Sequence, residues 1–282
     1  MRVEVGQLDV EGFEGVALRP AQLCPICGTA SSTGRPCRTI HPDAPVGVLL
    51  RRCRSCRHMW IDPLPTQGFL THLYSSGSRS VLGVGWRTGP RSLSWPEALV
   101  ASTARGSGAY FELGVGQGIL YETMRARGWE CQGVEPGASH DAPPGVVPSV
   151  DDLAPGQRFQ VLVANDVLEH IADPLEALVG LRTMTAVDGE LFGSFPRGTS
   201  LRGRLQGPRW RMVRPFGHVH FFSRTSAEKV LEAAGFRLVT WRTSDLATEG
   251  PATVRSHVAR LVEQVGLGDQ AWFHAVPVES RS

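Results

Sequence analysis

Three glycines and a neighbouring acid are the first residues of this chain whose types and spacing could do chemistry. Gly114, Gly116 and Gly118 follow an apolar segment, residues 109–113, and precede a segment with helical spacing. Glycines let the backbone pass close to a ligand. Glu112 stands two residues before the first glycine, where it would repel a pyrophosphate and attract a cationic group. The turn therefore predicts a nucleotide-type ligand that carries a positive charge.

A second acid stands at the separation that a ribose contact requires. Glu135 follows the glycine turn by about 20 residues and ends the next apolar segment, where a carboxylate can accept hydrogen bonds from both ribose hydroxyls. The glycine spacing differs from the dinucleotide fingerprint, and no Lys-Ser or Lys-Thr follows it, which excludes a phosphate-cradling P-loop. The turn and the two acids together favour a ligand site over solvated strand ends.

Four cysteines form a second group with a chemical pattern. They make two Cys-x-x-Cys pairs, Cys24 with Cys27 and Cys53 with Cys56. Each pair places two thiolates on one side of a tight turn, and two pairs give a closed tetrahedral cage suited to a structural zinc. A redox dithiol is disfavoured because two pairs occur and no thioredoxin-like pattern surrounds them. Cys37, His41 and His58 are further possible ligands, each less favoured than the paired cysteines.

The elements that must position these residues follow an alternating pattern. Strands are expected at residues 109–113, 130–135, 159–164, 190–195, 236–241 and 271–278, and helices at 97–104, 119–127, 174–184, 225–234 and 253–264. This alternation predicts an α/β fold with a doubly wound, mostly parallel sheet and helices on both faces. Residues 136–148 contain too many prolines for the helix that usually joins two such strands.

Several of these segments, in this order, resemble class I S-adenosylmethionine-dependent methyltransferases of the small-molecule, ubiquinone-type branch. Residues 112–118 resemble the first motif of that family and residues 133–135 the second. Residues 165–174 resemble the segment after its fourth strand, and residues 218–223 a later one. The resemblance implies a seven-stranded Rossmann-like sheet, S-adenosylmethionine as cofactor, and methyl transfer as the activity.

The resemblance also implies which residues bind the cofactor. Glu112 and the three glycines would surround the methionine end, and Glu135 would hold the ribose. Asn165 and Asp166 would line the side of the sulfonium group.

The adenine side departs from the family pattern. Asp151, or its neighbour Asp152, stands where the family has an acid that meets the adenine amino group. The short segment 136–148 precedes these acids in place of a helix, so their position relative to the adenine is the least defined part of the expected site.

The cysteine-bearing segment is similar to that of zinc-ribbon methyltransferases acting on small molecules, including sugar C-methyltransferases. In those proteins the segment after the ribbon, which here carries Pro63-Leu64-Pro65 and Leu73-Tyr74, folds over the cofactor. We therefore expect three parts: a zinc ribbon at 1–62, a linker and helical lid at 63–104, and the methyltransferase domain at 105–282.

A group of arginines indicates which kind of molecule could receive the methyl group. Six arginines lie between the strand at 190–195 and His218: Arg197, Arg202, Arg204, Arg209, Arg211 and Arg214. They would bind an anionic substrate such as a phosphate, a carboxylate or a carrier-bound thioester. Alternatively, they belong to a solvated loop and reflect the general use of arginine in place of lysine in this chain.

Methyl transfer needs a base only if the acceptor must lose a proton. His218, His220 and Tyr74 are the candidates for that role.

Composition limits the alternatives. The chain has 282 residues, 41 % of them hydrophobic, a net charge of +2, and neither a membrane-length apolar run nor an apolar segment of signal-peptide type. We expect a soluble, cytoplasmic enzyme that methylates a small, anionic biosynthetic intermediate, a secondary metabolite or sugar-type compound. The alternative is a zinc-ribbon RNA methyltransferase, with Arg51, Arg52, Arg54 and Arg57 on phosphates, which the near-neutral charge disfavours. A non-catalytic cofactor-binding protein is a third possibility, and the intact glycine turn argues against it.

Overall fold

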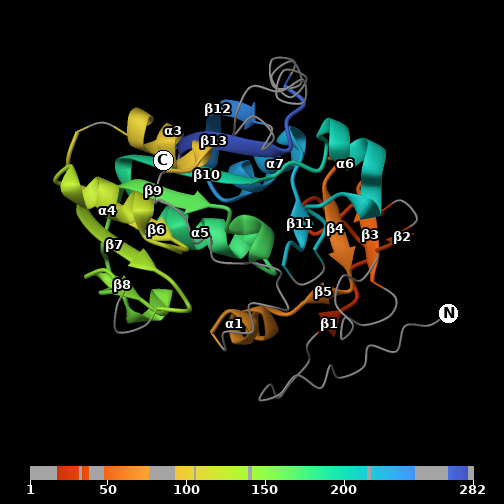
Figure 1. Cartoon of the computed structure of the whole chain (residues 1–282), viewed down its shortest axis with the longest axis horizontal. Helices are drawn as coiled ribbons and strands as arrows, with labels where there is room; N and C mark the ends of the chain where they lie inside the picture. Colours follow the sequence, from red (N-terminus) through yellow and green to blue (C-terminus); the bar gives the residue numbers. More distant parts are fainter. Residues whose placement is uncertain are drawn as a thin grey trace.

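The computed structural model describes residues 18–31, 34–37, 48–75, 93–104, 106–138, 142–214, 217–244 and 266–278. A seven-stranded sheet with helices on both faces forms its centre, and a smaller group of antiparallel strands lies at one end of that sheet (Figure 1). None of the described helices is long and apolar enough to cross a membrane.

The central sheet has the strand order β12-β13-β10-β9-β6-β7-β8. Five strands run parallel: β6 (Ala109–Leu113), β7 (Glu130–Val134), β8 (Val146–Val147), β9 (Phe159–Asn165) and β10 (Thr185–Pro196). β13 (Gln270–Pro277) runs antiparallel between β10 and β12 (Phe236–Ser244). The chain leaves β6 and β9 in opposite directions across the sheet, so the carboxyl ends of these two strands flank the crevice where such sheets bind ligands. The predicted doubly wound, mostly parallel sheet is confirmed.

Two apolar clusters fix the helices to the sheet. α3 (Trp95–Thr103) and α4 (Ile119–Ala126) cover one face, where they pack against Tyr110, Phe192 and Trp272. α5 (Pro174–Met184) and α7 (Arg224–Ala233) cover the other face, against Phe111, Phe195 and Phe273. Successive residues of a strand point to opposite faces, so Tyr110 and Phe111 belong to different clusters.

Local signals set the ends of the helices. The carboxylate of Asp173 accepts hydrogen bonds from the amides of Leu175 and Glu176 at 3.1 and 3.2 Å, and Pro174 fills the first position of α5. α7 ends before Gly235, whose φ of 83° is the left-handed conformation that glycine adopts without a Cβ clash.

A second sheet joins the amino-terminal segment to a segment late in the chain. Its strand order is β11-β4-β3-β2, with β2 (Arg35–Pro36), β3 (Leu49–Arg52) and β4 (Met59–Asp62) from the cysteine-bearing segment and β11 (His220–Phe221) from the segment after β10. β1 (Leu18–Arg19) pairs with β5 (Leu64–Pro65). α6 (Leu201–Gln206) lies beside this sheet, and α1 (Gln67–Ser75) lies near β5 (Figure 1).

Most predicted elements appear within a few residues of their expected bounds. The main difference is β10, which begins at Thr185 rather than at residue 190 and whose pairing with β9 is irregular between Thr185 and Glu190. Short 3-10 turns, η1 (Val150–Asp152), η2 (Leu168–His170) and η3 (Gly207–Arg209), interrupt the loops. No helix occurs in the described parts of 136–148, as expected. The helix expected at 253–264 lies outside the described residues.

The division of the chain at residues 62 and 104 stays a prediction. α3, which was assigned to the lid segment, packs in the same apolar cluster as α4 and the central sheet.

Phe273 tests the central role of β13 in the core. Its side chain is fully buried among Phe195, Phe236 and neighbouring aliphatic residues, so Phe273→Ala should lower the free energy of unfolding by about 3–5 kcal/mol in urea titrations. Val187→Ala, at a side chain that is 91 % exposed, is the control and should change it by less than about 0.5 kcal/mol. Equal effects of the two substitutions would contradict this packing.

Candidate active site and metal centre

The glycine turn lies between β6 and α4 and is held open by its backbone conformation. Gly114, Gly116 and Gly118 all have positive φ, at 76°, 53° and 74°. A Cβ on Gly114 would collide with Val167, whereas a Cβ on Gly116 would meet no atom within 4 Å. The backbone at Gly116 therefore faces open space on the carboxyl side of the sheet, which is what a ligand contact by the backbone needs.

The side chain of Glu135 contacts the backbone of this turn. Its Oε2 accepts a hydrogen bond from the amide of Gly116 at 2.8 Å, and its Oε1 accepts one from the amide of Gly137 at 3.3 Å. The side chain is partly exposed. The predicted neighbourhood of Glu135 and the glycine turn therefore exists, and the carboxylate retains acceptor capacity for hydroxyl groups.

Asn165 is the last residue of β9, and Asp166 follows it beside the glycine turn. Both the Nδ2 and the Oδ1 of Asn165 are buried and have no hydrogen-bond partner among the described residues. Asp166 has a φ of 53°, and its carboxylate accepts hydrogen bonds from Ser194 Oγ at 2.9 Å and from Gln270 Nε2 at 2.8 and 3.0 Å. Buried polar atoms without partners are rare in native proteins, so the Asn165 amide points to a polar ligand at this position.

Glu112 is the most unusual group of the site. Its side chain is buried, and Tyr110 donates a hydrogen bond from its hydroxyl to Oε2 at 2.8 Å. Burial, together with repulsion from Glu97 and Glu135, raises the pKa of Glu112 to about 8. A bound cation would strongly stabilise the ionised form of this carboxyl, because its charge compensates for the hydration that the carboxylate loses on burial.

Sequence reasoning missed three residues of this site. Ser194 on β10 and Gln270 on β13 position Asp166, and their roles depend on strand register. Glu97 on α3 lies close enough to raise the pKa of both Glu112 and Asp166, where burial is the larger cause. No local motif marks any of the three.

The two acids expected to meet the adenine lie together in the short turn η1. Asp152 accepts a hydrogen bond from the amide of Ser149 at 3.1 Å and so caps η1. Asp151 is exposed in the same turn. Of the two acids, Asp151 is the one whose carboxylate is not engaged in capping.

Comparison with known proteins identifies the type of domain. A family model described as "Methyltransferase domain" matches residues 94–240, more than half of the chain. The chain belongs to this methyltransferase family. The match includes the glycine turn, Glu135, Asn165 and Asp166, so the residues described above lie in an S-adenosylmethionine-dependent methyltransferase. No curated protein sequence matches the chain.

The fold is similar to those of several solved proteins, two methyltransferases and a cyclase among them. A 1,6-didemethyltoxoflavin-N1-methyltransferase from Burkholderia thailandensis, solved with 1,6-didemethyltoxoflavin and S-adenosylhomocysteine, is 14% identical with a TM-score of 0.54, covering 87% of this chain and 100% of its own. Two further structures have lower TM-scores. The [4+2]-cyclase SpnF is 18% identical with a TM-score of 0.49, covering 77% and 98%. A Clostridium acetobutylicum S-adenosylmethionine-dependent methyltransferase is 10% identical with a TM-score of 0.44, covering 74% and 97%.

The residues present fit S-adenosylmethionine. The buried Glu112 carboxylate suits an ammonium group, the amide of Asn165 lacks partners among the described residues, and the Gly116 backbone faces open space. When bound, the cofactor would supply an electrophilic methyl group on its sulfonium. Asn165 and Asp166 would face that side, and Glu135 would face the ribose.

The three candidate bases lie in different surroundings. His220 is fully buried in β11. Its Nδ1 lies 3.1 Å from His58 Nε2, and its Nε2 lies 3.4 Å from the carbonyl oxygen of Ala172. His218 lies next to His170, with ring centroids 4.8 Å apart. Tyr74 lies in α1, but its side chain is outside the described residues. The structure therefore brings no two of these three side chains together among the described residues, and their catalytic roles stay predictions.

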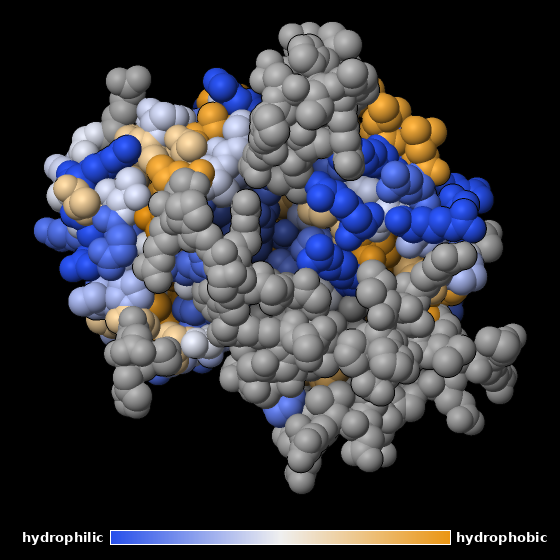
Figure 2. All heavy atoms as spheres, in the orientation of Figure 1, coloured by the Kyte–Doolittle hydropathy of each residue, from blue (hydrophilic) through white to orange (hydrophobic). Residues whose placement is uncertain are grey.

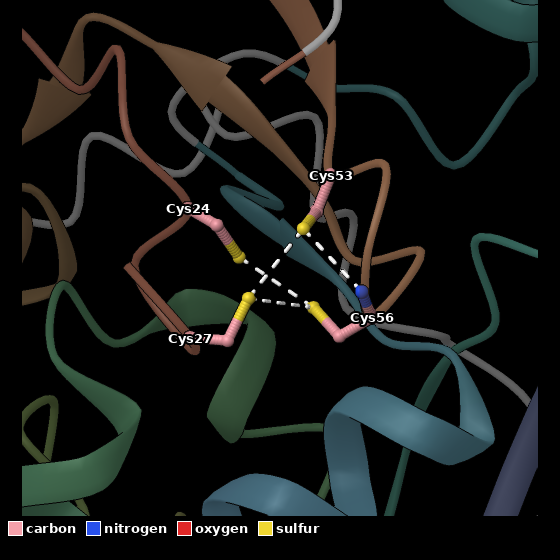
Figure 3. A group of neighbouring side chains, drawn as sticks. All are labelled: Cys24, Cys27, Cys53 and Cys56. Atoms are coloured by element: carbon pink, nitrogen blue, oxygen red, sulfur yellow. Dashed lines mark hydrogen bonds between the residues drawn. The ribbon is translucent and has the colours of Figure 1, made fainter. Parts of the chain in front are cut away.

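The four paired cysteines converge on one point (Figure 3). The Sγ of Cys27 lies 3.5 Å from those of Cys53 and Cys56, and the Sγ atoms of Cys24 and Cys56 are 3.6 Å apart. Four thiolates at about 2.3 Å from a zinc ion are about 3.8 Å from one another, so a small expansion fits the metal. The predicted cluster of four cysteines is present, and its chemistry is compatible with zinc.

Two of the other possible ligands, Cys37 and His58, do not belong to this cluster. Burial raises the pKa of Cys37 to about 12, and its side chain packs with Val48, Trp210 and their neighbours. His58 is fully buried against His220. His41 lies outside the described residues.

Glu135 tests the cofactor site. Glu135→Ala removes both the acceptor for ribose hydroxyls and the support of the glycine turn, so S-adenosylmethionine should bind at least about tenfold more weakly in calorimetry. Glu130→Ala, at an exposed position of the preceding strand, is the matched control. Unchanged affinity in Glu135→Ala would remove the assignment.

Glu112 tests the electrostatics of the methionine end. Its pKa of about 8 keeps the carboxyl mostly protonated at pH 7, and a bound ammonium favours the carboxylate. Binding of S-adenosylmethionine at pH 7 should therefore release a proton, seen as heat that depends on the ionisation enthalpy of the buffer. Glu112→Gln should abolish this dependence, and a wild-type protein without it would contradict the account.

The cysteine cluster predicts one tightly held zinc. Replacing Cys24 and Cys27 by serine should lose it, measured as metal content after exhaustive dialysis, because two oxygens replace soft thiolate ligands. Cys131→Ser, a cysteine outside the cluster, should keep the zinc. A double variant with unchanged zinc content would show that these cysteines are not the ligands.

Proposed function

We propose that this methyltransferase transfers the methyl group of S-adenosylmethionine to a small, anionic acceptor, a biosynthetic intermediate of secondary-metabolite or sugar type. One observation carries the proposal. Arginines from two segments far apart in the sequence gather between the cysteine-bearing sheet and α6, and the Nε atoms of Arg52 and Arg197 are buried without a hydrogen-bond partner among the described residues.

The arginines of the two segments divide into paired and unpaired groups. Arg51 forms an ion pair with Asp62 at 2.5 Å, and Arg202 forms one with Asp269 at 2.8 Å. Arg52 has no such partner among the described residues: its Nε is buried without a hydrogen bond, and burial and the charges of Arg57 and Arg204 lower its pKa. Cations held this close to one another favour an anion between them.

We infer that a path for the acceptor runs from this cluster to the methyl donor side. Ser194 donates a hydrogen bond to the carboxylate of Asp166, and Arg197 comes three residues later. In an extended strand the backbones of Ser194 and Arg197 are about 10 Å apart. The Nε of Arg197 is also buried without a partner among the described residues, and burial and the charge of Arg204 lower its pKa. Figure 2 shows hydrophilic side chains around a hollow in the middle of this face of the molecule. An anionic acceptor bound along this path would reach the sulfonium side of the cofactor.

The chain would act mainly by positioning the reactants. Methyl transfer is an in-line displacement whose barrier falls when donor and acceptor are aligned in a site from which water is excluded. α1 supports a covering role for the segment after the ribbon, because Gln67 accepts a hydrogen bond from the amide of Ala172 at 3.0 Å, close to the end of η2. This contact fits the predicted lid.

The test compares acceptors that differ only in charge. Small carboxylic acids and their neutral amides should be screened in pairs for methylation by the full chain, and the acids should have at least about tenfold higher kcat/KM. Arg204→Gln should raise KM for the acids, and Arg237→Gln, an exposed arginine on β12, should not. Equal use of acids and amides would contradict an anionic acceptor.

The RNA alternative rests on Arg51, Arg52, Arg54 and Arg57 of the ribbon, of which Arg51 is paired with Asp62. It is distinguished by salt, because a protein that contacts several phosphates loses affinity steeply as salt rises. Methylation of a folded RNA with that dependence, and no activity on small acids, would favour it.

A further inference from the structure

Beyond the cysteine cluster, one more group of described side chains has the composition of a metal site. Glu169, His170 and His218 each offer a ligand atom, and these atoms all lie within 4.8 Å of one another. Glu169 and His170 belong to η2, just after Asn165 and Asp166, and His218 precedes β11. Two imidazoles and one carboxylate are a ligand set that divalent transition metals bind.

The two histidines are oriented as ligands usually are. The Nδ1 of His170 lies 2.5 Å from the carbonyl of Gly217, and the Nδ1 of His218 lies 2.9 Å from the carbonyl of Met212. A carbonyl only accepts, so each Nδ1 carries the proton and each Nε2 keeps its lone pair. Metal-binding histidines almost always have their second nitrogen fixed in this way.

Glu169 supplies the third observation. Its side chain is 1% exposed, its Oε1 lies 3.7 Å from His170 Nε2, and its Oε2 is buried without a hydrogen-bond partner among the described residues. A buried carboxylate oxygen in this state is costly unless a donor or a metal satisfies it.

We propose that Glu169, His170 and His218 form a second metal site, for a divalent transition ion, beside the methyl donor. Zinc holds nitrogen and oxygen ligands at about 2.0–2.2 Å, so in a tetrahedral site they lie about 3.3–3.6 Å apart, and binding would draw the outermost atoms, which lie within 4.8 Å of one another, together by about an ångström. Three ligands leave positions open for an exogenous group. His218 then has a role different from the general base that the sequence predicts.

The surroundings indicate what the open positions would take. Arg214 lies close enough that its charge lowers the pKa of both histidines. A divalent ion beside an arginine, with one carboxylate ligand, leaves a net positive charge that favours an anion. Resting on the proposed function, the metal would bind the anionic oxygen of the acceptor and help to fix it next to Asn165 and Asp166. Without that function, the same three ligands would still bind the ion.

The experiment measures metal binding without cofactor or acceptor, so that its outcome is separate from that of the proposed function. The full chain is first loaded with one equivalent of Zn²⁺, which the four thiolates retain, and is then titrated with Co²⁺. One further Co²⁺ per chain should bind, with visible d–d absorption and without the near-ultraviolet thiolate-to-cobalt band that the cysteine site would give.

Variants locate the ion. Glu169→Gln, nearly the same in shape, and His218→Gln should each weaken Co²⁺ binding at least about tenfold, while retained zinc content shows that each variant is folded. Glu190→Gln removes the carboxylate of a different pair, Glu190 with His274 at 2.9 Å, and should change nothing. No second equivalent of Co²⁺, a thiolate band, or equal binding in the folded variants would each overturn the proposal.

Discussion

The structure depends on how β11 and its flanking residues join two parts of the chain. The amide of Val219 donates to the carbonyl of Glu169 at 2.8 Å, and the carbonyl of Val219 accepts from the amide of Ile61 at 3.1 Å. Its side chain is buried against Cys24, Cys53 and Cys56. Buried backbone groups must find partners, so this one residue fixes the cysteine-bearing sheet, η2 and the loop after β9 relative to one another.

Further contacts reinforce that junction. Ser223 donates to the carbonyl of Cys56 at 2.6 Å, and the buried pair of His58 and His220 spans the same boundary. The cysteine cluster therefore does more than fold its own segment. It supports the backbone from which Glu169 and His170 project, and it places Arg52 and Arg57 near Arg204. Under the proposed function, the ribbon would thereby contribute to the acceptor side, while β6, β7 and β9 would provide the cofactor side.

Local spacing was enough to predict part of this arrangement. The glycine turn, Glu135 and the cysteine pairs are defined by short sequence separations, and the structure brings each of these groups together as expected. Strand and helix positions followed from hydrophobic periodicity and from signals such as Asp173 and Gly235. The partners of Asp166 could not be predicted in this way, because Ser194 and Gln270 reach it only through the register of β10 and β13.

The same limit explains the other features that sequence reasoning missed. The pairing of β11 with β4 and the contact of His58 with His220 require two short strands that lie far apart in the chain. Short strands without turns between them carry no register signal in the sequence. The arginines of the ribbon and of α6 were recognised separately for this reason, as candidates for RNA and for a small anion, and only the tertiary structure makes them neighbours.

The central claim is that the crevice between β6 and β9 binds S-adenosylmethionine. Isothermal titration of the full chain with S-adenosylmethionine, and then with S-adenosylhomocysteine, tests it most directly. The account predicts one saturable site per chain for each compound, with the two competing for it. The absence of saturable binding by a folded, zinc-containing protein would contradict it.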